Sequence, residues 1–176
     1  MDHPVQYPCY SVDTSALIWL SDEMPPDVYP SVWAPVYQLA SELRLIVSEI
    51  VVDECKREYP AIDRLFTDYP QVVVGFGPIQ EHFASFQRDV TARSTRLTRV
   101  DDTRDRADPY VVSAALAAEE RDLGDMTVRQ GSDRTCTVVT YESDRGGLRK
   151  IPNVCKLYSL GCAKWPDVMR ASGYVI

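Results

Sequence analysis

Histidine is scarce in this sequence, and long apolar runs are missing. Only two histidines, His3 and His82, occur among 176 residues, which is too few for a histidine-rich zinc site and a poor supply for a Ser-His-Asp triad. No stretch approaches the roughly eighteen uninterrupted apolar residues of a membrane span, and residues 1–13 lack the basic start and apolar run of a signal peptide. We expect a cytoplasmic protein that does not bind a membrane and whose catalysis relies on carboxylates.

The five cysteines form an odd number, and no pair has C-x-x-C spacing. This count and spacing fit neither a disulfide framework nor a zinc ribbon. We interpret the cysteines as small buried apolar residues. They are Cys9, Cys55, Cys136, Cys155 and Cys162.

The length and charge of the chain limit its organisation and its partners. With 45% hydrophobic and 26% charged residues, the chain can bury one continuous core, so we predict a single domain over residues 1–176. The net charge of −7 argues against a surface that is basic throughout, as in many nonspecific nucleic-acid binders. It does not exclude a nucleic-acid substrate, because a metal ion bound by acids supplies the largest local charge.

Short apolar segments alternate with helical patterns along the chain. Strands are predicted at residues 9–12, 44–47, 71–75, 136–140 and 160–163. Helices are predicted after Asp13, from Pro30 to about residue 43, from an N-cap at Ser48 to Pro60, at 62–66, as an exposed arm over 78–98, and at 108–120, 151–157 and 167–171. This alternation predicts an α/β fold with three layers, α/β/α, around a central parallel sheet of four to five short strands.

Two aspartates stand where an acid could either cap a helix or serve a functional site. Asp13 lies between the first strand and a helix, and Asp108, before Pro109, opens the helix over 108–120. Ligands of parallel sheets bind beyond the carboxyl ends of the strands, which favours a functional role for acids placed there. When each residue is considered alone, capping explains Asp13 as well as a functional role does, and it explains Asp108 completely. Both interpretations stay open at this point.

Two further acids have the same ambiguity. Glu54 lies at the edge of the buried face of its helix, a position at which a glutamate is usually a solvent-exposed residue without a functional role. At the end of the fourth strand, Glu142 follows Thr140 closely, but Asp144 is a neighbouring candidate. Hydrolysis of a phosphodiester requires activation of water and neutralisation of phosphate charge, and carboxylate-bound Mg²⁺ or Mn²⁺ does both. Acids from several distant segments fit that chemistry.

Four segments follow one another along the chain: YSVDTSALIWL at 10–20, VSEIVVDECKRE at 47–58, ADPYVVSAALA at 107–117 and VVTYE at 138–142. Taken together and in this order, they resemble the PIN domain. The segment KIPNVCKLYSLGC and the last helix are similar to the C-terminus of a divergent, little-characterised PIN-like family related to the VapC toxins. The matches extend from Tyr10 to Val175. The resemblance implies a metal-dependent endoribonuclease that is the toxin of a toxin-antitoxin pair.

The resemblance also implies roles for particular residues. Asp13, Glu54 and Asp108 match the acids that hold a Mg²⁺ or Mn²⁺ ion and carry the catalysis. Glu142 stands for the fourth acid, usually an aspartate, so a second ion would bind weakly or not at all. Three hydroxyl residues would orient ligands or water, namely Thr14, Ser15 and Thr140. RNA is the implied substrate, and a cognate antitoxin and a second copy of the chain are the implied partners.

Arginines accumulate between residues 87 and 107. Their planar guanidinium groups suit a clamp on the RNA backbone, although a solvated, salt-bridged helix explains the same spacing. Arg104 and Arg106, directly before Asp108, are the better candidates for substrate contacts. The remaining arginines of this segment are Arg88, Arg93, Arg96 and Arg99.

Other interpretations of the sequence remain. Because the fourth acid is substituted, the chain could be a catalytically weak or inactive PIN-fold module that binds RNA or protein. A phosphatase with an aspartyl intermediate at Asp13 is disfavoured, because that chemistry requires D-x-D and here Thr14 and Ser15 follow. The aromatic residues of the early helices either form an interface or fill the core; they are Trp19, Trp33 and Tyr37.

Overall fold

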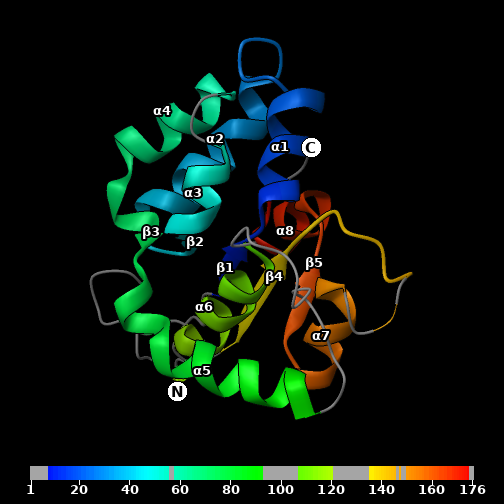
Figure 1. The fold of residues 1–176 in the computed structure, drawn as a ribbon. Coiled ribbons are helices and arrows are strands. Elements are labelled where there is room, and N and C mark those ends of the chain that lie inside the picture. Colours follow the sequence, from blue (N-terminus) through cyan, green and yellow to red (C-terminus); the bar gives the residue numbers. More distant parts are fainter. Residues whose placement is uncertain are drawn as a thin grey trace, which may run out of the picture.

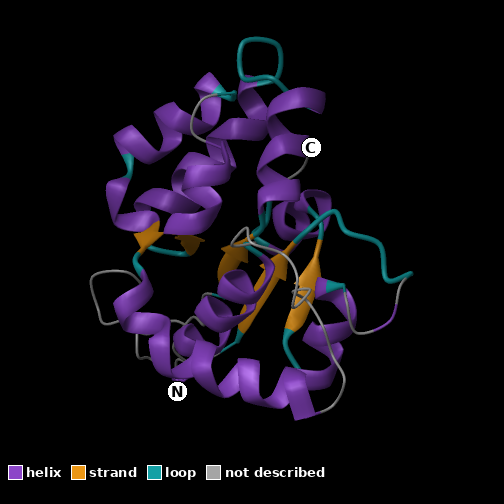
Figure 2. Cartoon of the chain, in the orientation of Figure 1, coloured by secondary structure: helices purple, strands orange, loops and turns teal. Residues whose placement is uncertain are grey.

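The computed structural model describes residues 8–55, 58–92, 107–120, 135–145, 147 and 150–174. Its centre is a sheet of five parallel strands in the order β3-β2-β1-β4-β5 (Figure 1 and Figure 2). The strands are β1 (Cys9–Val12), β2 (Leu45–Ser48), β3 (Val73–Val74), β4 (Cys136–Val139) and β5 (Gly161–Ala163). The predicted parallel sheet is confirmed.

Helices cover the sheet on both faces. Among the described residues they are α1 (Thr14–Glu23), α2 (Pro30–Ser41), α3 (Glu49–Cys55), α4 (Pro60–Asp68), α5 (Phe76–Ala92), α6 (Asp108–Glu120), α7 (Ile151–Tyr158) and α8 (Trp165–Ala171). The chain runs from β1 through β2 to β3 at one edge of the sheet and then crosses to β4 and β5 at the other edge. Because parallel crossovers are right-handed, the helices of these two halves lie on opposite faces. Helices α1 to α4 accordingly lie on one face and α5 to α7 on the other, which confirms the three layers (Figure 1).

Apolar burial explains why the strands lie at the centre. Every residue of β1 and β2 is buried, as expected for strands covered on both faces. Two buried hydrogen bonds then fix helices against this core. Ser11 Oγ donates to Val111 O at 2.9 Å, which joins β1 to α6, and Trp165 Nε1 donates to Ala16 O at 2.9 Å, which joins α8 to α1. No helix within the described ranges is both long and apolar enough to cross a membrane.

Some boundaries differ from those predicted. The third strand is only two residues long, because Pro70 starts a 3₁₀ turn over Pro70–Val72 that occupies the first two residues of the predicted strand. Ser48 does not cap the next helix as predicted. It belongs to β2, and its buried hydroxyl has no hydrogen-bond partner among the described residues.

The predicted exposed arm over 78–98 is also corrected where the structure describes it. Helix α5 packs along α6 and buries Ile79 and Phe86 completely or nearly so. The apolar positions are sparse in the sequence, but two large side chains on one face suffice to dock the helix. Residues 93–98 of the predicted arm lie outside the described residues.

The predicted environments of the cysteines and early aromatic residues are confirmed in part. Four of the five cysteines are buried, whereas Cys162 is exposed, contrary to the prediction. Trp33 is fully buried and therefore belongs to the core and not to an interface. Trp19 and Tyr37 are partly buried and pack against that core.

Gly161→Ala should destabilise the fold, because a Cβ at Gly161 would lie 2.5 Å from Thr137 Oγ1 on the paired strand β4. We expect a loss of about 1–3 kcal/mol in the free energy of unfolding, as for other overpacked positions. Urea denaturation measures it, and adding Thr137→Ala should restore most of the loss. An unchanged midpoint for the single variant would contradict this account of the β4-β5 contact.

Candidate carboxylate site

The topology of the sheet places the ends of β1 and β4 at its switch point. The chain leaves β1 toward β2 and later returns past β1 to form β4 on its other side. In open parallel sheets the crevice beyond the carboxyl ends of two such strands is the usual ligand site. Asp13 directly follows β1 and Thr140 directly follows β4, and the two ends are joined because Asp13 N donates to Val139 O at 3.0 Å.

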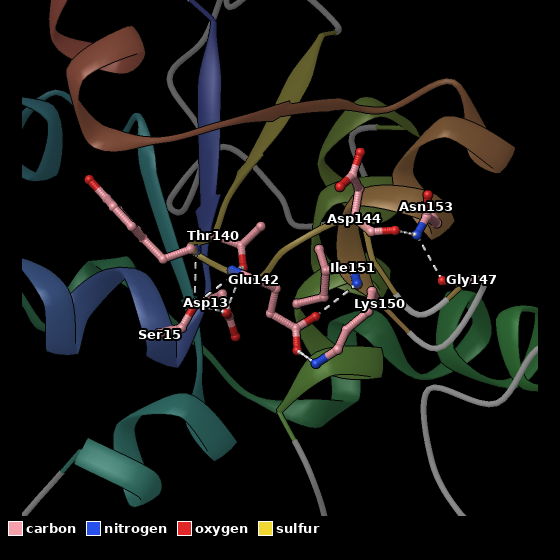
Figure 3. A network of polar contacts seen from close by, with 10 residues as sticks. Asp13, Ser15, Thr140, Glu142, Asp144, Gly147, Lys150, Ile151 and Asn153 are labelled. Atoms are coloured by element: carbon pink, nitrogen blue, oxygen red, sulfur yellow. Dashed lines mark hydrogen bonds and ion pairs between the residues drawn. The ribbon is translucent and has the colours of Figure 1, made fainter.

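The carboxylate of Asp13 is held by two hydroxyl groups from different elements. Ser15 Oγ donates to Asp13 Oδ2 at 2.5 Å, and Thr140 Oγ1 donates to the same oxygen at 2.9 Å (Figure 3). The residue is only 3% exposed. Although Asp13 occupies the N-cap position of α1, its side chain makes no capping hydrogen bond. The hydrogen bonds from the two hydroxyls therefore tie the carboxylate to the end of β4 as well as to α1.

Both hydroxyl oxygens also accept a hydrogen bond from a backbone amide. Ser15 Oγ accepts from Tyr141 N at 3.0 Å, and Thr140 Oγ1 accepts from Glu142 N at 3.1 Å. Each hydroxyl therefore has its own hydrogen left to donate to the carboxylate, and the two hydroxyl oxygens lie 3.2 Å apart. The buried carboxylate is thus built into the turn after β4 as much as into α1.

The pKa of Asp13 is raised, mainly because burial penalises the charged carboxylate. The Ser15 and Thr140 hydroxyls lower this pKa, while the negative charge of Glu142 raises it further. A carboxylate in such a site is stabilised either by a proton or by a nearby cation. The site therefore favours a positive partner for Asp13.

The raised pKa makes the stability of the metal-free protein depend on pH. Because the folded pKa lies above the ordinary value of 3.8, the folded state holds a proton that the unfolded state releases, and stability falls as pH rises from 3.8 through the folded pKa. Asp13→Asn removes this loss. The difference in free energy of unfolding between the variant and wild type should therefore grow across that window. A pH-independent difference, measured by urea denaturation in chelator, would contradict the assigned burial effect.

Glu54 lies beside Asp13 and connects three helices. One carboxylate oxygen accepts a hydrogen bond from the Thr14 hydroxyl, and Oε1 accepts from Ala107 N at 3.2 Å, directly before α6. The pKa of the Cys55 thiol is raised to about 12, mainly by burial and also by the charges of Glu54 and Asp13, so both acids lie near this thiol. The side chain of Glu54 is otherwise exposed. Asp108, the first residue of α6, is half-buried one residue beyond the amide that binds Glu54.

Glu142 lies on the other side of Asp13 but already has partners. Lys150 Nζ donates to Glu142 Oε1 at 2.6 Å, and Ile151 N, in the first turn of α7, donates to Oε2 at 2.9 Å (Figure 3). Asp144, the alternative fourth acid, has a largely exposed side chain that pairs with Lys156 at 3.9 Å. Of these two acids, Glu142 is the one whose charge acts on Asp13.

The family described as "Domain of unknown function (DUF4411)" has a sequence model that matches residues 10–176. The chain belongs to this family. No curated protein and no solved structure matches the chain. The match includes every acid described above and all strand residues except Cys9, so the site lies inside the DUF4411 domain.

The oxygen donors of this DUF4411 site suit a hard divalent ion such as Mg²⁺ or Mn²⁺. Both hydroxyls bind Oδ2 of Asp13, so they leave Oδ1 to an ion. Within the described ranges, however, no group of three or more histidine, cysteine or acidic residues lies close enough to hold a metal. Glu142 is a poor ligand because Lys150 neutralises it. Asp13, which has Oδ1 left for an ion, is the residue of the site that fits such a ligand.

Two residues predicted for the DUF4411 site lie outside the described part of the chain, and two lysines at the site were not predicted. Arg104 and Arg106, the predicted substrate contacts, lie outside the described residues. Lys150 was missed, because it immediately precedes the helix that starts with Ile151 and Pro152, a place that favours an acid and not a cation. Lys164 was missed as well. It follows β5 as Asp13 follows β1, and the same strand-end rule could have found it.

Proposed function

We propose that the chain is a metal-dependent endoribonuclease of the PIN type, which hydrolyses RNA phosphodiesters at the carboxyl ends of β1 and β4. The observation that carries this proposal is the buried carboxylate of Asp13, which two hydroxyls bind at the switch point of a parallel sheet. A buried acid with a raised pKa, in the crevice where such sheets bind ligands, is a candidate for function. The resemblance of the four sequence segments to the PIN domain supplies the reaction class.

On this proposal Asp13, Glu54 and Asp108 hold the ion. When bound, the ion activates water and neutralises charge on the phosphate. Ser15 and Thr140 orient the Asp13 carboxylate through their hydrogen bonds, and Thr14 does the same for Glu54. The hydrogen bond from Ala107 N holds Glu54 at the start of α6, which brings Asp108 to the same end of the sheet.

Glu142 has a supporting role on this proposal. Its two carboxylate oxygens are bound by the Lys150 ammonium and the Ile151 amide, so it stabilises the start of α7. Its side chain is 17% exposed. On this proposal, the glutamate that stands here for the aspartate of the PIN pattern does not create a second ion site of comparable strength.

The biological role follows only from the resemblance to VapC-related proteins. It suggests a toxin that acts on RNA in the cytoplasm and is held inactive by a cognate antitoxin, with a homodimer as a further possibility. Trp19 and Tyr37 remain candidates for such interfaces because they are partly exposed, whereas Trp33 is not available. Arg104 and Arg106 remain predicted substrate contacts.

A second candidate function is a PIN-like module that binds RNA or protein without cutting. The Lys150–Glu142 ion pair favours it, because an ammonium group already compensates one acid of the site. The bonds that Glu54 makes to Thr14 and Ala107 also favour it, since they engage both carboxylate oxygens. Such a module would need no metal.

Incubation of the purified protein with a mixed RNA pool separates the two candidates. The nuclease should cut in Mg²⁺ or Mn²⁺ and not in chelator. The Asp13→Asn variant, purified in parallel, controls for a contaminating nuclease and should not cut. RNA binding without cleavage in either metal would favour the second candidate, and equal cleavage by wild type and variant would remove the catalytic assignment.

A further inference from the structure

A cavity of about 580 Å³ opens beside the candidate site, between the ends of β4 and β5. Thr140 and Glu142 border it on the side of β4, and Cys162 and Lys164 border it on the side of β5. Thr140 N donates to Ala163 O at 3.1 Å, so the two strand ends are held together up to the rim of the cavity. The cavity therefore begins at a residue that binds Asp13.

Lys164 is held at a defined place on this rim. Its ammonium lies over the ring of Tyr141, 5.4 Å from the centroid. The Tyr141 ring in turn stacks on Trp19, with the centroids 4.4 Å apart and the planes inclined by 13°. The backbone of Tyr141 is fixed by its hydrogen bond to Ser15. A cation over an aromatic face is attracted to it but keeps its charge.

The charge of Lys164 is not compensated by a carboxylate of the described residues. The other two lysines at this edge are paired, Lys150 with Glu142 at 2.6 Å and Lys156 with Asp144 at 3.9 Å. Asp167, the acid nearest in sequence, pairs with Arg170 and accepts only the backbone amide of Lys164, at 3.5 Å. An anionic ligand in the cavity would supply the missing counter-charge.

We propose that Lys164 binds a phosphate of the RNA strand as that strand leaves the carboxylate site. This rests on the function proposed above, since it assigns the path of the same substrate. A lysine ammonium is a compact point charge that suits a phosphate oxygen, and its aromatic support limits the freedom lost on binding. The strand then runs from Asp13, past Thr140, into the cavity between β4 and β5.

Binding of a fluorescently labelled, mixed-sequence single-stranded RNA tests this assignment. Anisotropy is measured in chelator, where the proposed nuclease does not cut, over a series of salt concentrations. Lys164→Gln should weaken binding about tenfold, as for loss of one charged hydrogen bond, and reduce the salt slope by about 0.7. Lys164→Arg should retain most of the affinity. Arg64→Gln removes the same charge from α4, where Arg64 pairs with Asp68, and should bind like wild type.

Equal RNA affinities and equal salt slopes for Lys164→Gln and Arg64→Gln would overturn the assignment. Lys164 would then only pack on the ring of Tyr141. Absence of RNA binding by wild type would overturn it too. Cleavage by wild type in Mg²⁺, measured separately, distinguishes this failure from that of the proposed function. If wild type cuts RNA and Lys164→Gln binds RNA as well as wild type does, only the phosphate contact is refuted. If RNA binding depends on Lys164 but wild type does not cut, only the nuclease function is refuted.

Discussion

Asp13→Asn should lower RNA cleavage about a thousandfold or more while leaving the fold intact, the scale expected when a group central to the chemistry is removed. Both hydroxyl bonds of Asp13 go to Oδ2. An asparagine whose carbonyl oxygen takes that place keeps both bonds and puts an uncharged NH₂ group at the position of Oδ1. The change therefore removes an ion ligand with little effect on packing. Initial rates on a defined RNA in Mg²⁺ measure it.

Other acids provide graded controls for this prediction. Glu54→Gln and Asp108→Asn should also reduce cleavage by orders of magnitude, because on our proposal each holds the same ion. Glu142→Gln should cost much less, since Lys150 and Ile151 already bind that carboxylate. Losses of equal size for Glu142 and Asp13 would contradict the roles assigned here. So would an Asp13→Asn enzyme of undiminished rate.

Trp165→Ala should produce the largest loss of stability among these variants. The indole is 1% exposed, and its N–H donates to Ala16 O at 2.9 Å, so it joins α8 to the helix that follows Asp13. Removal of a buried tryptophan leaves a cavity and costs about 3–5 kcal/mol. Urea denaturation measures the free energy of unfolding, and the midpoint should fall accordingly.

Trp165→Phe separates packing from hydrogen bonding at the same position. The phenyl ring fills part of the space but cannot donate to Ala16 O, so we expect a smaller loss than for alanine, with about 0.5–1.5 kcal/mol from the lost hydrogen bond. If Trp165→Ala were as stable as wild type, α8 would not be docked on α1 as described. If phenylalanine cost as much as alanine, the hydrogen bond would outweigh the packing.

The parts of the fold that the sequence predicted are those with continuous apolar runs. Strands β1, β2 and β4 are largely buried runs bounded by polar or turn residues, and alternation with helices is enough to imply a parallel sheet. The short edge strand β5 was predicted as well, although none of its residues is buried. Strand β3 was predicted too long because valine-rich sequence also fits a 3₁₀ turn after Pro70. Helix α5 was predicted to be an exposed arm because its two buried apolar side chains, Ile79 and Phe86, give only a weak pattern in the sequence. In the structure these two side chains are buried and α5 packs against α6.

The site was predictable where chain position alone decides it. Asp13 could be selected because an acid at a strand end in a parallel sheet faces the usual ligand crevice. The binding of Glu142 by Lys150 could not be predicted, since it depends on how the intervening turn brings a lysine eight residues away back to the carboxylate. For the same reason the ring of Tyr141 beneath Lys164 requires the packing of β4 against β5.

Titration of the metal-free protein with Mn²⁺, followed by calorimetry, tests the central claim most directly. Wild type should bind an ion at the acids around Asp13, and Asp13→Asn should lose that binding while Glu142→Gln retains it. Mn²⁺ should also remove the stability difference between wild type and Asp13→Asn at neutral pH, because the ion compensates the buried charge. Equal Mn²⁺ affinity in wild type and Asp13→Asn would contradict the account.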